Sequence, residues 1–107
     1  MRRGEIWLVA GGVYASKPRP AIVVQDDRFD TDSVTVCPLT TTVLDAPLLR
    51  LPVPSDEVTG IERASYAMVD KLTTIRRSNA TERVGHVAPA LMVELERRIA
   101  VFLGLAG

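Results

Sequence analysis

The stretch Lys17–Val24, KPRPAIVV, places one arginine between two prolines, directly before an apolar and β-branched run. Each proline fixes its own φ near about −65°, and Pro20 also pushes Arg19 towards an extended backbone. Proline suits the first residue of a strand, and the run that follows is rich in strand-forming residues. The stretch therefore predicts the beginning of a β-strand with a closely held guanidinium. Taken alone, it fits an ordinary strand beginning with a solvated arginine.

Runs of similar composition recur on both sides of this stretch. Five of them are expected as strands: Glu5–Ala10, Ala21–Gln25, Val34–Leu39, Leu48–Val53 and Ala67–Leu72. Turn residues separate them, at Gly11-Gly12, Asp26–Ser33 and Pro54–Gly60. The segment Asn79–Arg83 is expected as a helical turn or a loop. Short strands at close spacing, with no helical pattern between them, predict a small antiparallel barrel or a strongly bent sheet.

Only the C-terminal end has a helical period. From Pro89 onward one stripe of a helix is apolar, formed by Met92, Leu95, Ile99, Phe102 and Leu103. Pro89 and Gly104 are the start and stop signals, so we expect this helix to cover the open side of the sheet. The predicted fold class is mainly β with α (α+β): a small SH3-like antiparallel β-barrel with a C-terminal helix. A chain of 107 residues fits a single domain, residues 1–107.

Composition narrows the classes of function. Thirteen basic and thirteen acidic residues cancel, so a nucleic-acid partner would need a local basic patch. Cys37 is the only cysteine, which excludes an internal disulfide and a cysteine-based metal site. We expect it to be a small buried apolar residue. The N-terminal apolar run is too short for a signal peptide and no stretch approaches a membrane span, so we expect a cytoplasmic protein.

Familiar catalytic schemes find little support. His86 is the only histidine and is expected in a loop before the helix, so a mechanism with paired histidines is excluded. Neither a GxSxG elbow nor a glycine-rich phosphate loop is present. One hydrophilic loop is acidic, but its spacing is not that of an EF-hand and a solvated turn explains it better; its aspartates are Asp26, Asp27, Asp30 and Asp32. Metal catalysis is therefore disfavoured, and no cofactor is expected.

Arginine and hydroxyl chemistry remains. Residues 34–42, VTVCPLTTT, end an apolar strand in three threonines. If this strand lies beside the one that begins at Pro20, Arg19 and Thr40 meet at one rim of the sheet. A fixed guanidinium stabilises the charge that builds on a phosphate under attack, and a threonine hydroxyl can orient the phosphate or a 2′-hydroxyl. RNA carries its own nucleophile, so alignment alone favours cleavage without a metal. The β-propensity of threonine and turn capping explain the same residues equally well.

The motifs occur in a distinctive order. RRGEIWLV, KPRPAIVVQDDRFD, VTVCPLTTT and SYAMVDKLTTIRRSNATERVGHV, followed by a helix ending in FLGL, resemble the MazF/PemK family of toxin endoribonucleases over nearly the whole chain. The resemblance implies a PemK-like barrel, a homodimer, and metal-independent, sequence-specific cleavage of single-stranded RNA. The products would carry 2′,3′-cyclic phosphate and 5′-hydroxyl ends, and translation and growth would be inhibited. It also implies a cognate MazE-like antitoxin that covers the RNA groove.

The resemblance assigns two catalytic residues. Arg19 matches the arginine of the family's Arg-Pro motif and is expected to stabilise the phosphorane, with proton transfer left open as a second role. Thr40 matches the threonine that follows Pro-Leu and is expected to position the substrate. The chain departs from the family before Lys17, where only GGVYAS (residues 11–16) replaces a longer loop that often contains an acid, so the general base is not identified.

Further contacts with RNA are predicted from side-chain type. Tyr14 and Lys17 are expected to stack on a base and to attract phosphate, because both lie near Arg19 in the sequence. Other side chains are expected to line a groove, although a solvated side chain is the alternative for each: Arg28, Thr41, Lys71, Arg76 and Arg77.

Two other functions fit the same architecture. CcdB-like poisons of DNA gyrase share this fold without cutting RNA, and a small barrel can also be a binding module without chemistry. Arg19-Pro20 and Pro38-Leu39-Thr40 favour the nuclease, because a poison needs a docking surface instead.

Overall fold

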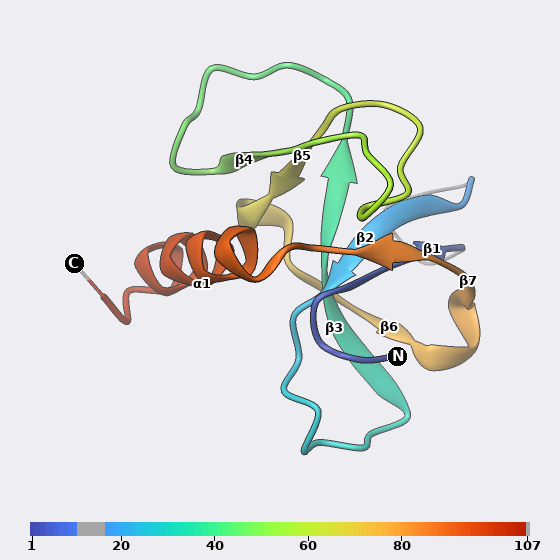
Figure 1. Ribbon diagram of the computed structural model, residues 1–107. Helices are drawn as coiled ribbons and strands as arrows, with labels where there is room; N and C mark the ends of the chain where they lie inside the picture. Colours follow the sequence, from blue (N-terminus) through green and yellow to red (C-terminus); the bar gives the residue numbers. More distant parts are fainter. Residues whose placement is uncertain (11–16, 107) are drawn as a thin grey trace.

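The computed structural model describes residues 1–10 and 17–106, which form one antiparallel sheet and one long helix (Figure 1). The strands in this part of the chain are β1 (Glu5–Val9), β2 (Arg19–Val23), β3 (Ser33–Thr40), β4 (Arg50–Val53), β5 (Ser65–Met68), β6 (Thr73–Arg76) and β7 (Ala80–His86). The sheet has the order β4-β5-β3-β2-β1-β7, and β6 pairs with β3 outside this path. The α-helix α1 (Pro89–Phe102) packs against one side.

The predicted fold class is confirmed: the protein is mainly β with a C-terminal helix. Every strand pair in the described residues is antiparallel. No ladder in that part of the chain joins β4 to β7, so the strongly bent sheet stays open instead of closing into a barrel. No helix within residues 1–10 and 17–106 has the length and apolar character needed to cross a membrane.

The long strand β3 organises the sheet. Its first half pairs with β6, its last two residues pair with β5, and its other edge pairs with β2. Pro38 lies where β3 passes from one partner to the other, between Val36 opposite Thr73 and Leu39 opposite Ala67. Because proline has no N–H for a ladder, this change of partner is a position where a central strand tolerates it.

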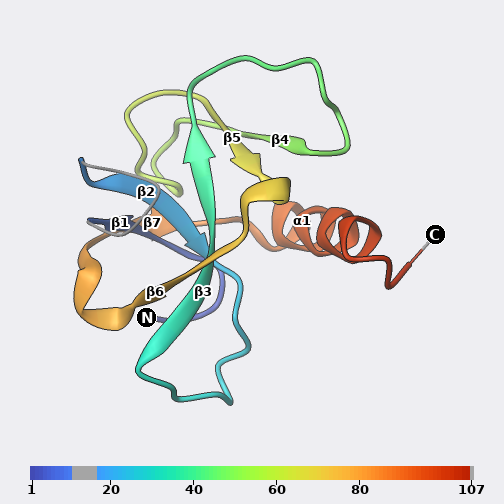
Figure 2. The same ribbon diagram turned by 180° about the vertical axis from the view of Figure 1, so that it is seen from behind.

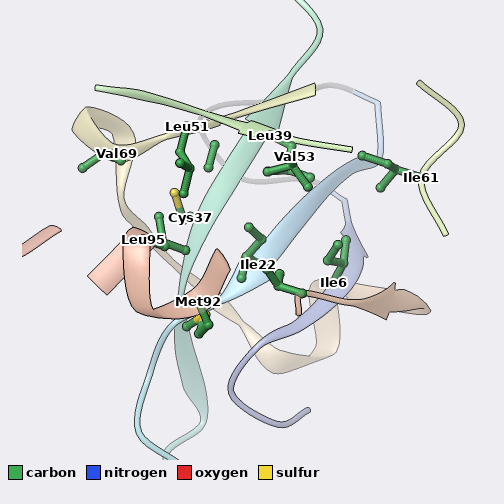
Figure 3. Packing of buried hydrophobic residues seen from close by; sticks show 12 residues of the cluster. Ile6, Ile22, Cys37, Leu39, Leu51, Val53, Ile61, Val69, Met92 and Leu95 are labelled. Carbon is green, nitrogen blue, oxygen red and sulfur yellow. The ribbon is translucent and has the colours of Figure 1, made fainter. Parts of the chain in front are cut away.

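Two clusters of buried side chains hold the sheet in shape. In the larger one, Met92 and Leu95 of α1 pack towards Ile22 and Cys37 of the sheet (Figure 3). This contact confirms that Met92 and Leu95 of the predicted stripe cover the sheet and that Cys37 is a buried apolar residue. Ile99 is partly buried, whereas Phe102 and Leu103, which were expected in the same stripe, are exposed because the helix extends past the sheet at its C-terminal end. Burial raises the pKa of the Cys37 thiol to about 12, so it stays protonated at neutral pH. The second cluster contains Val9, Ala21, Val23, Val34, Val36 and Ile75.

The sequence missed the strands after β5. The expected strand Ala67–Leu72 ends at Met68, and a 3₁₀ helix, η1 (Val69–Lys71), follows it. A second, η2 (Arg77–Asn79), separates β6 from β7. The expected loop around His86 was wrong, because His86 is the last residue of β7 and pairs with Glu5 of β1. Most side chains of β7 are exposed or half-buried, so backbone pairing with β1 holds a strand that has no apolar periodicity.

Candidate active site

The register of the sheet brings Arg19 and Thr40 to the same rim. Strands β2 and β3 pair in register from Val23 opposite Val36 to Ala21 opposite Pro38. Continuing the same antiparallel register by two residues sets Arg19 opposite Thr40. Arg19 also lies opposite Val9 of β1, and Thr40 opposite Tyr66 of β5. The two residues that the sequence predicted as catalytic therefore occupy one row across neighbouring strands.

The two side chains differ in their surroundings. Arg19 is exposed, and none of the ion pairs among the described residues includes it. Thr40 is half-buried, and its Oγ1 accepts a hydrogen bond of 3.1 Å from the backbone N–H of Thr42. A hydroxyl that accepts one such bond keeps its own proton for donation to a phosphate oxygen. The rim therefore presents a cation and an oriented hydroxyl.

A pocket of about 440 Å³ opens beside this rim. Arg19 and Thr41 line it from β2 and from the end of β3. Its other walls come from the beginning of β2, from β1 and β7, and from the segment between β4 and β5 together with the first residue of β5. These residues are Pro18, Pro20, Leu8, Glu82, Val84, Gly60, Ile61, Glu62, Arg63 and Ser65. The pocket thus joins residues that lie far apart in the sequence.

The segment between β4 and β5, residues 54–64, forms a rigid wall of this pocket. Asp56 Oδ1 accepts hydrogen bonds of 2.9 Å from the backbone N–H groups of both Val58 and Thr59. The buried Thr59 hydroxyl donates to the Pro54 carbonyl at 2.7 Å, and the Ser55 hydroxyl donates to the Ile61 carbonyl, also at 2.7 Å. These bonds fix the loop internally, so its side chains are held in place around the pocket.

Two glycines allow the backbone of this loop to lie directly against the backbone of β7. Gly60 has φ +70°, and a Cβ there would lie 2.2 Å from the carbonyl oxygen of Val84. A Cβ on Gly85 would lie 2.3 Å from the carbonyl oxygen of Thr59. The backbone N–H of His86 donates to the Val58 carbonyl at 3.0 Å. The two segments are side by side in Figures 1 and 2, where the loop folds over β2 and β7.

Three charged residues of the pocket were missed by the sequence analysis. Glu82 lies in β7, so the prediction of a helical turn or a loop over Asn79–Arg83 was wrong, and Glu62 and Arg63 lie in the loop wall. None of the three has a partner among the ion pairs found in residues 1–10 and 17–106. No local sequence signal points to them, because they reach the pocket only through tertiary contacts.

The other predicted RNA contacts fall into two groups. Lys17 is exposed two residues before Arg19, and Thr41 lines the pocket, so both lie at the predicted catalytic rim. Tyr14 lies outside the described residues. Arg76 pairs with Ser33 at the opposite end of β3, roughly 23 Å along the strand from Thr40. Lys71 is exposed in η1, which contacts α1.

Arg28 and Arg77 belong to that distant end of β3. Arg28 forms an ion pair of 3.2 Å with Asp26, and its guanidinium lies 5.5 Å from the ring centroid of Phe29. Arg77 donates a hydrogen bond to the Thr31 carbonyl. The structure therefore brings together Lys17, Arg19, Thr40 and Thr41, and it does not bring Arg28, Lys71, Arg76 or Arg77 to them.

A second hollow, of about 370 Å³, lies at this distant end and is lined by Met1, Arg2, Val23, Gln25, Asp26, Asp27, Asp30, Val34 and Arg77. Its three aspartates repel a phosphate, and Arg2 and Arg28 are already paired with Asp27 and Asp26. The pocket beside Arg19 instead has two arginines, Arg19 and Arg63, and two glutamates, Glu62 and Glu82.

Comparison with known proteins gives a family match over most of the chain. Residues 2–103 match the family described as PemK-like, MazF-like toxins of type II toxin-antitoxin systems. A relative from Mycolicibacterium smegmatis, named a probable endoribonuclease MazF, is 51% identical over 109 residues that cover 100% of both chains.

Solved structures share the fold. The Mycobacterium tuberculosis toxin MazF-mt6 superposes with a TM-score of 0.82 at 24% identity, covering 96% of this chain and 99% of that one. An endoribonuclease in complex with its cognate antitoxin, from a mycobacterial species, has a TM-score of 0.81 at 24% identity, covering 100% and 98%.

Proposed function

Because this chain belongs to the PemK-like, MazF-like toxin family of type II toxin-antitoxin systems, we propose that its Arg19–Thr40 rim cleaves single-stranded RNA by internal transesterification. As a member of this family it is a toxin endoribonuclease of a toxin-antitoxin system. The chemistry of the cut is the proposal. The observation that carries it is the β2–β3 register, which, continued by two residues, sets the exposed Arg19 opposite the Thr40 hydroxyl at a rim where Arg19 and Thr41 line a pocket.

The residues divide the work of the reaction. Arg19 donates hydrogen bonds to the non-bridging oxygens as the 2′-oxygen attacks the adjacent phosphorus, where negative charge accumulates. Thr40 donates from its hydroxyl to the same phosphate, and the N–H of Thr42 fixes that hydroxyl from the other side. The products are a 2′,3′-cyclic phosphate and a 5′-hydroxyl. No step uses a metal ion or a cofactor. Lys17 and Arg63 add positive charge along the path of the RNA.

The assembly is part of the proposal. We propose a homodimer whose RNA-binding face is covered by a cognate MazE-like antitoxin, as the complex of a mycobacterial relative with its antitoxin supports. The place of action is the cytoplasm, where messenger RNA is translated. Sequence-specific cutting there would inhibit translation and growth.

The decisive experiment is cleavage of a long single-stranded RNA by the purified protein, with and without EDTA, followed by end-group analysis. We expect EDTA-resistant cuts that leave 5′-hydroxyl ends. Arg19→Ala is expected to slow cleavage by about 100-fold or more, because a preorganised donor to the developing charge is lost. Thr40→Val, which keeps the shape of the side chain, is expected to slow it by a smaller factor.

Arg76→Ala is the matched control, because it removes an exposed arginine from the far end of the same sheet. Its rate should equal that of the unchanged protein. Full cleavage by Arg19→Ala would contradict the proposed site. No cleavage by the folded, antitoxin-free protein, together with inhibition of DNA gyrase, would support the gyrase poison instead.

A further inference from the structure

The proton of the attacking 2′-hydroxyl needs an acceptor, and the Arg19–Thr40 rim does not supply one. A guanidinium keeps its proton up to a pH of about 12 or more, and a threonine hydroxyl is no better as a base. His86 pairs with Glu5, whereas Arg19 pairs with Val9, four residues further along β1 and roughly 13 Å away along the strand. The only titratable acids or bases that line the described pocket, other than arginines, are Glu62 and Glu82.

We propose that the carboxylate of Glu82 is the general base that accepts the 2′-hydroxyl proton, an inference that rests on the proposed ribonuclease function. Leu8 of β1 pairs with Pro20 on one side and with Glu82 on the other. Residues directly opposite one another project to the same face of a sheet. Glu82 therefore lies on the same face of the sheet as Leu8 and Pro20 and lines the pocket with them, and two strand spacings separate its Cα from that of Pro20, about 10 Å. Arg19, the first residue of β2, lines the same pocket, so both residues border the hollow where the phosphate is proposed to lie.

The backbone of β7 is shaped around Glu82. The ladder pairs Val9 with Ala80 and Leu8 with Glu82, which leaves Thr81 as an extra residue. The Thr81 hydroxyl donates to the Leu8 carbonyl at 3.3 Å, which ties this bulge to β1. A second irregularity follows after Arg83. Bulges of this kind re-aim side chains and are frequent next to active sites.

The charges around Glu82 leave it able to act as a base. Its neighbour Arg83 donates to Glu5 Oε2 at 2.8 Å and is thereby neutralised by another acid. The groups that face Glu82 across the pocket are Arg19 from β2 and Glu62 with Arg63 from the loop wall. Glu62 belongs to the loop between β4 and β5, whereas Glu82 belongs to strand β7. Because side chains on strands are held more precisely than side chains on loops, Glu82 is the better candidate for the base.

The step is balanced in atoms and protons. The O2′–P bond forms as the proton of O2′ moves to Glu82, and the P–O5′ bond breaks. O5′ takes a proton from water, and Glu82 returns its own to the solvent. No water molecule is consumed, and the products are the cyclic phosphate and the 5′-hydroxyl.

The test is the single-turnover cleavage rate of an RNA oligonucleotide with one cut site, measured against pH at saturating protein. The unchanged protein should lose rate at low pH, because the carboxylate must be ionised to accept a proton. Glu82→Gln should lower the maximal rate of the pH profile by about 100-fold. It should also abolish the loss of rate at low pH, the acidic limb of that profile. Glu82→Asp should restore part of the rate. Affinity for the same oligonucleotide with a 2′-O-methyl group at the cut site should be unchanged.

Glu57→Gln is the matched control, since Glu57 is exposed in the same loop wall and does not line the pocket. It should keep both rate and pH profile. A second substrate, with sulfur in place of the 5′-bridging oxygen, distinguishes a general base from a general acid. A thiolate leaves without a proton, so the loss of a general acid does not slow its cleavage, whereas the loss of a general base does. Glu82→Gln should remain slow on both substrates.

Three results would overturn the inference: an unchanged acidic limb in Glu82→Gln, recovery of its rate on the sulfur substrate alone, or a loss of affinity without loss of rate. An acidic limb that vanishes in Glu62→Gln instead would move the role to Glu62. If the unchanged protein cleaves and Arg19→Ala does not, any of these outcomes removes Glu82 only. If the unchanged protein does not cleave RNA, the proposed ribonuclease function is contradicted, and the inference about Glu82 is rejected with it.

Discussion

At the scale of single residues, the polar groups of this chain divide into those that hold the fold and those that face the pocket. Glu5 belongs to the first group: it accepts hydrogen bonds from the Arg2 backbone N–H at 2.6 Å, from Trp7 Nε1 at 3.1 Å and from Arg83 Nε at 2.8 Å. Partial burial alone would raise the pKa of Glu5. These hydrogen bonds outweigh it and lower the pKa from 4.5 to about 2.

This shift predicts how stability depends on pH. Because the pKa of Glu5 is lower in the folded state, its contribution is present above pH 4.5 and is lost as the pH falls towards 2. We expect Glu5→Gln to reduce the free energy of unfolding at neutral pH by about 2 kcal/mol, and to flatten the loss of stability in that acidic window. Urea denaturation at several pH values measures both. Equal slopes for Glu5→Gln and for Glu57→Gln would contradict the assignment.

At the scale of elements, the close approach of the β4–β5 loop to β7 determines the shape of the pocket. Gly85 of β7 leaves no room for a side chain, because the Thr59 carbonyl occupies that position. The loop carries Glu62 and Arg63, and β7 carries Glu82, so the distance between these elements sets the distance between their charges. Residues remote from Arg19 and Thr40 thereby shape the pocket.

We therefore expect Gly85→Ala to impair both stability and cleavage. The added methyl group meets backbone atoms, so the loop must shift, at a cost of about 1–3 kcal/mol in the free energy of unfolding. The cleavage rate should fall more than the lost fraction of folded protein explains. Thermal unfolding and single-turnover cleavage below the melting temperature measure the two effects.

Gly104→Ala is the control for Gly85→Ala. Gly104 has φ +74° with nothing within 4 Å of an added Cβ, so the substitution strains the backbone without touching the pocket. It should cost stability and leave the cleavage rate of the folded protein unchanged. Equal cleavage rates in both variants would contradict a role in cleavage for the close approach of the β4–β5 loop to β7.

At the scale of the whole molecule, one end leaves apolar side chains exposed. The end of α1 and the residues after it expose Val101, Phe102, Leu103 and Leu105. The loop between β3 and β4 reaches the same helix, where Arg98 donates to the Pro47 carbonyl, and it exposes Leu44 and Leu48. We call these side chains the C-terminal apolar patch. Several exposed apolar side chains at one end of a molecule are typical of an interface, and we expect the partner subunit of the proposed homodimer to cover them.

Light scattering after gel filtration tests this expectation. The unchanged protein should elute as a dimer, and the double substitution Phe102→Glu with Leu105→Glu should shift it to the monomer, because burying two charges in an apolar contact is unfavourable. Val93→Glu is the control: Val93 is also exposed, on the face of α1 opposite Phe102. A monomer in the unchanged protein would contradict the homodimer, and dissociation by Val93→Glu would move the interface to the other face.

The sequence by itself determined the elements whose side chains are buried. The β-branched runs that became β1 to β4 and the apolar stripe of α1 are local patterns, and burial on one face is enough to produce them. Arg19-Pro20 and Pro38-Leu39-Thr40 were also local, so the predicted catalytic pair could be named before its geometry was known. The single domain, residues 1–107, stays a prediction.

Only the tertiary structure decided what surrounds that pair. Strand β7 carries mostly exposed side chains and is held by backbone hydrogen bonds to β1, which leave no mark on the sequence. Glu82 lines the same pocket as Arg19, and it lies level with Pro20 because Leu8 pairs with both neighbouring strands. The register between distant segments depends on how the whole sheet bends around its core. The local preferences of residues 80–86 do not determine this register.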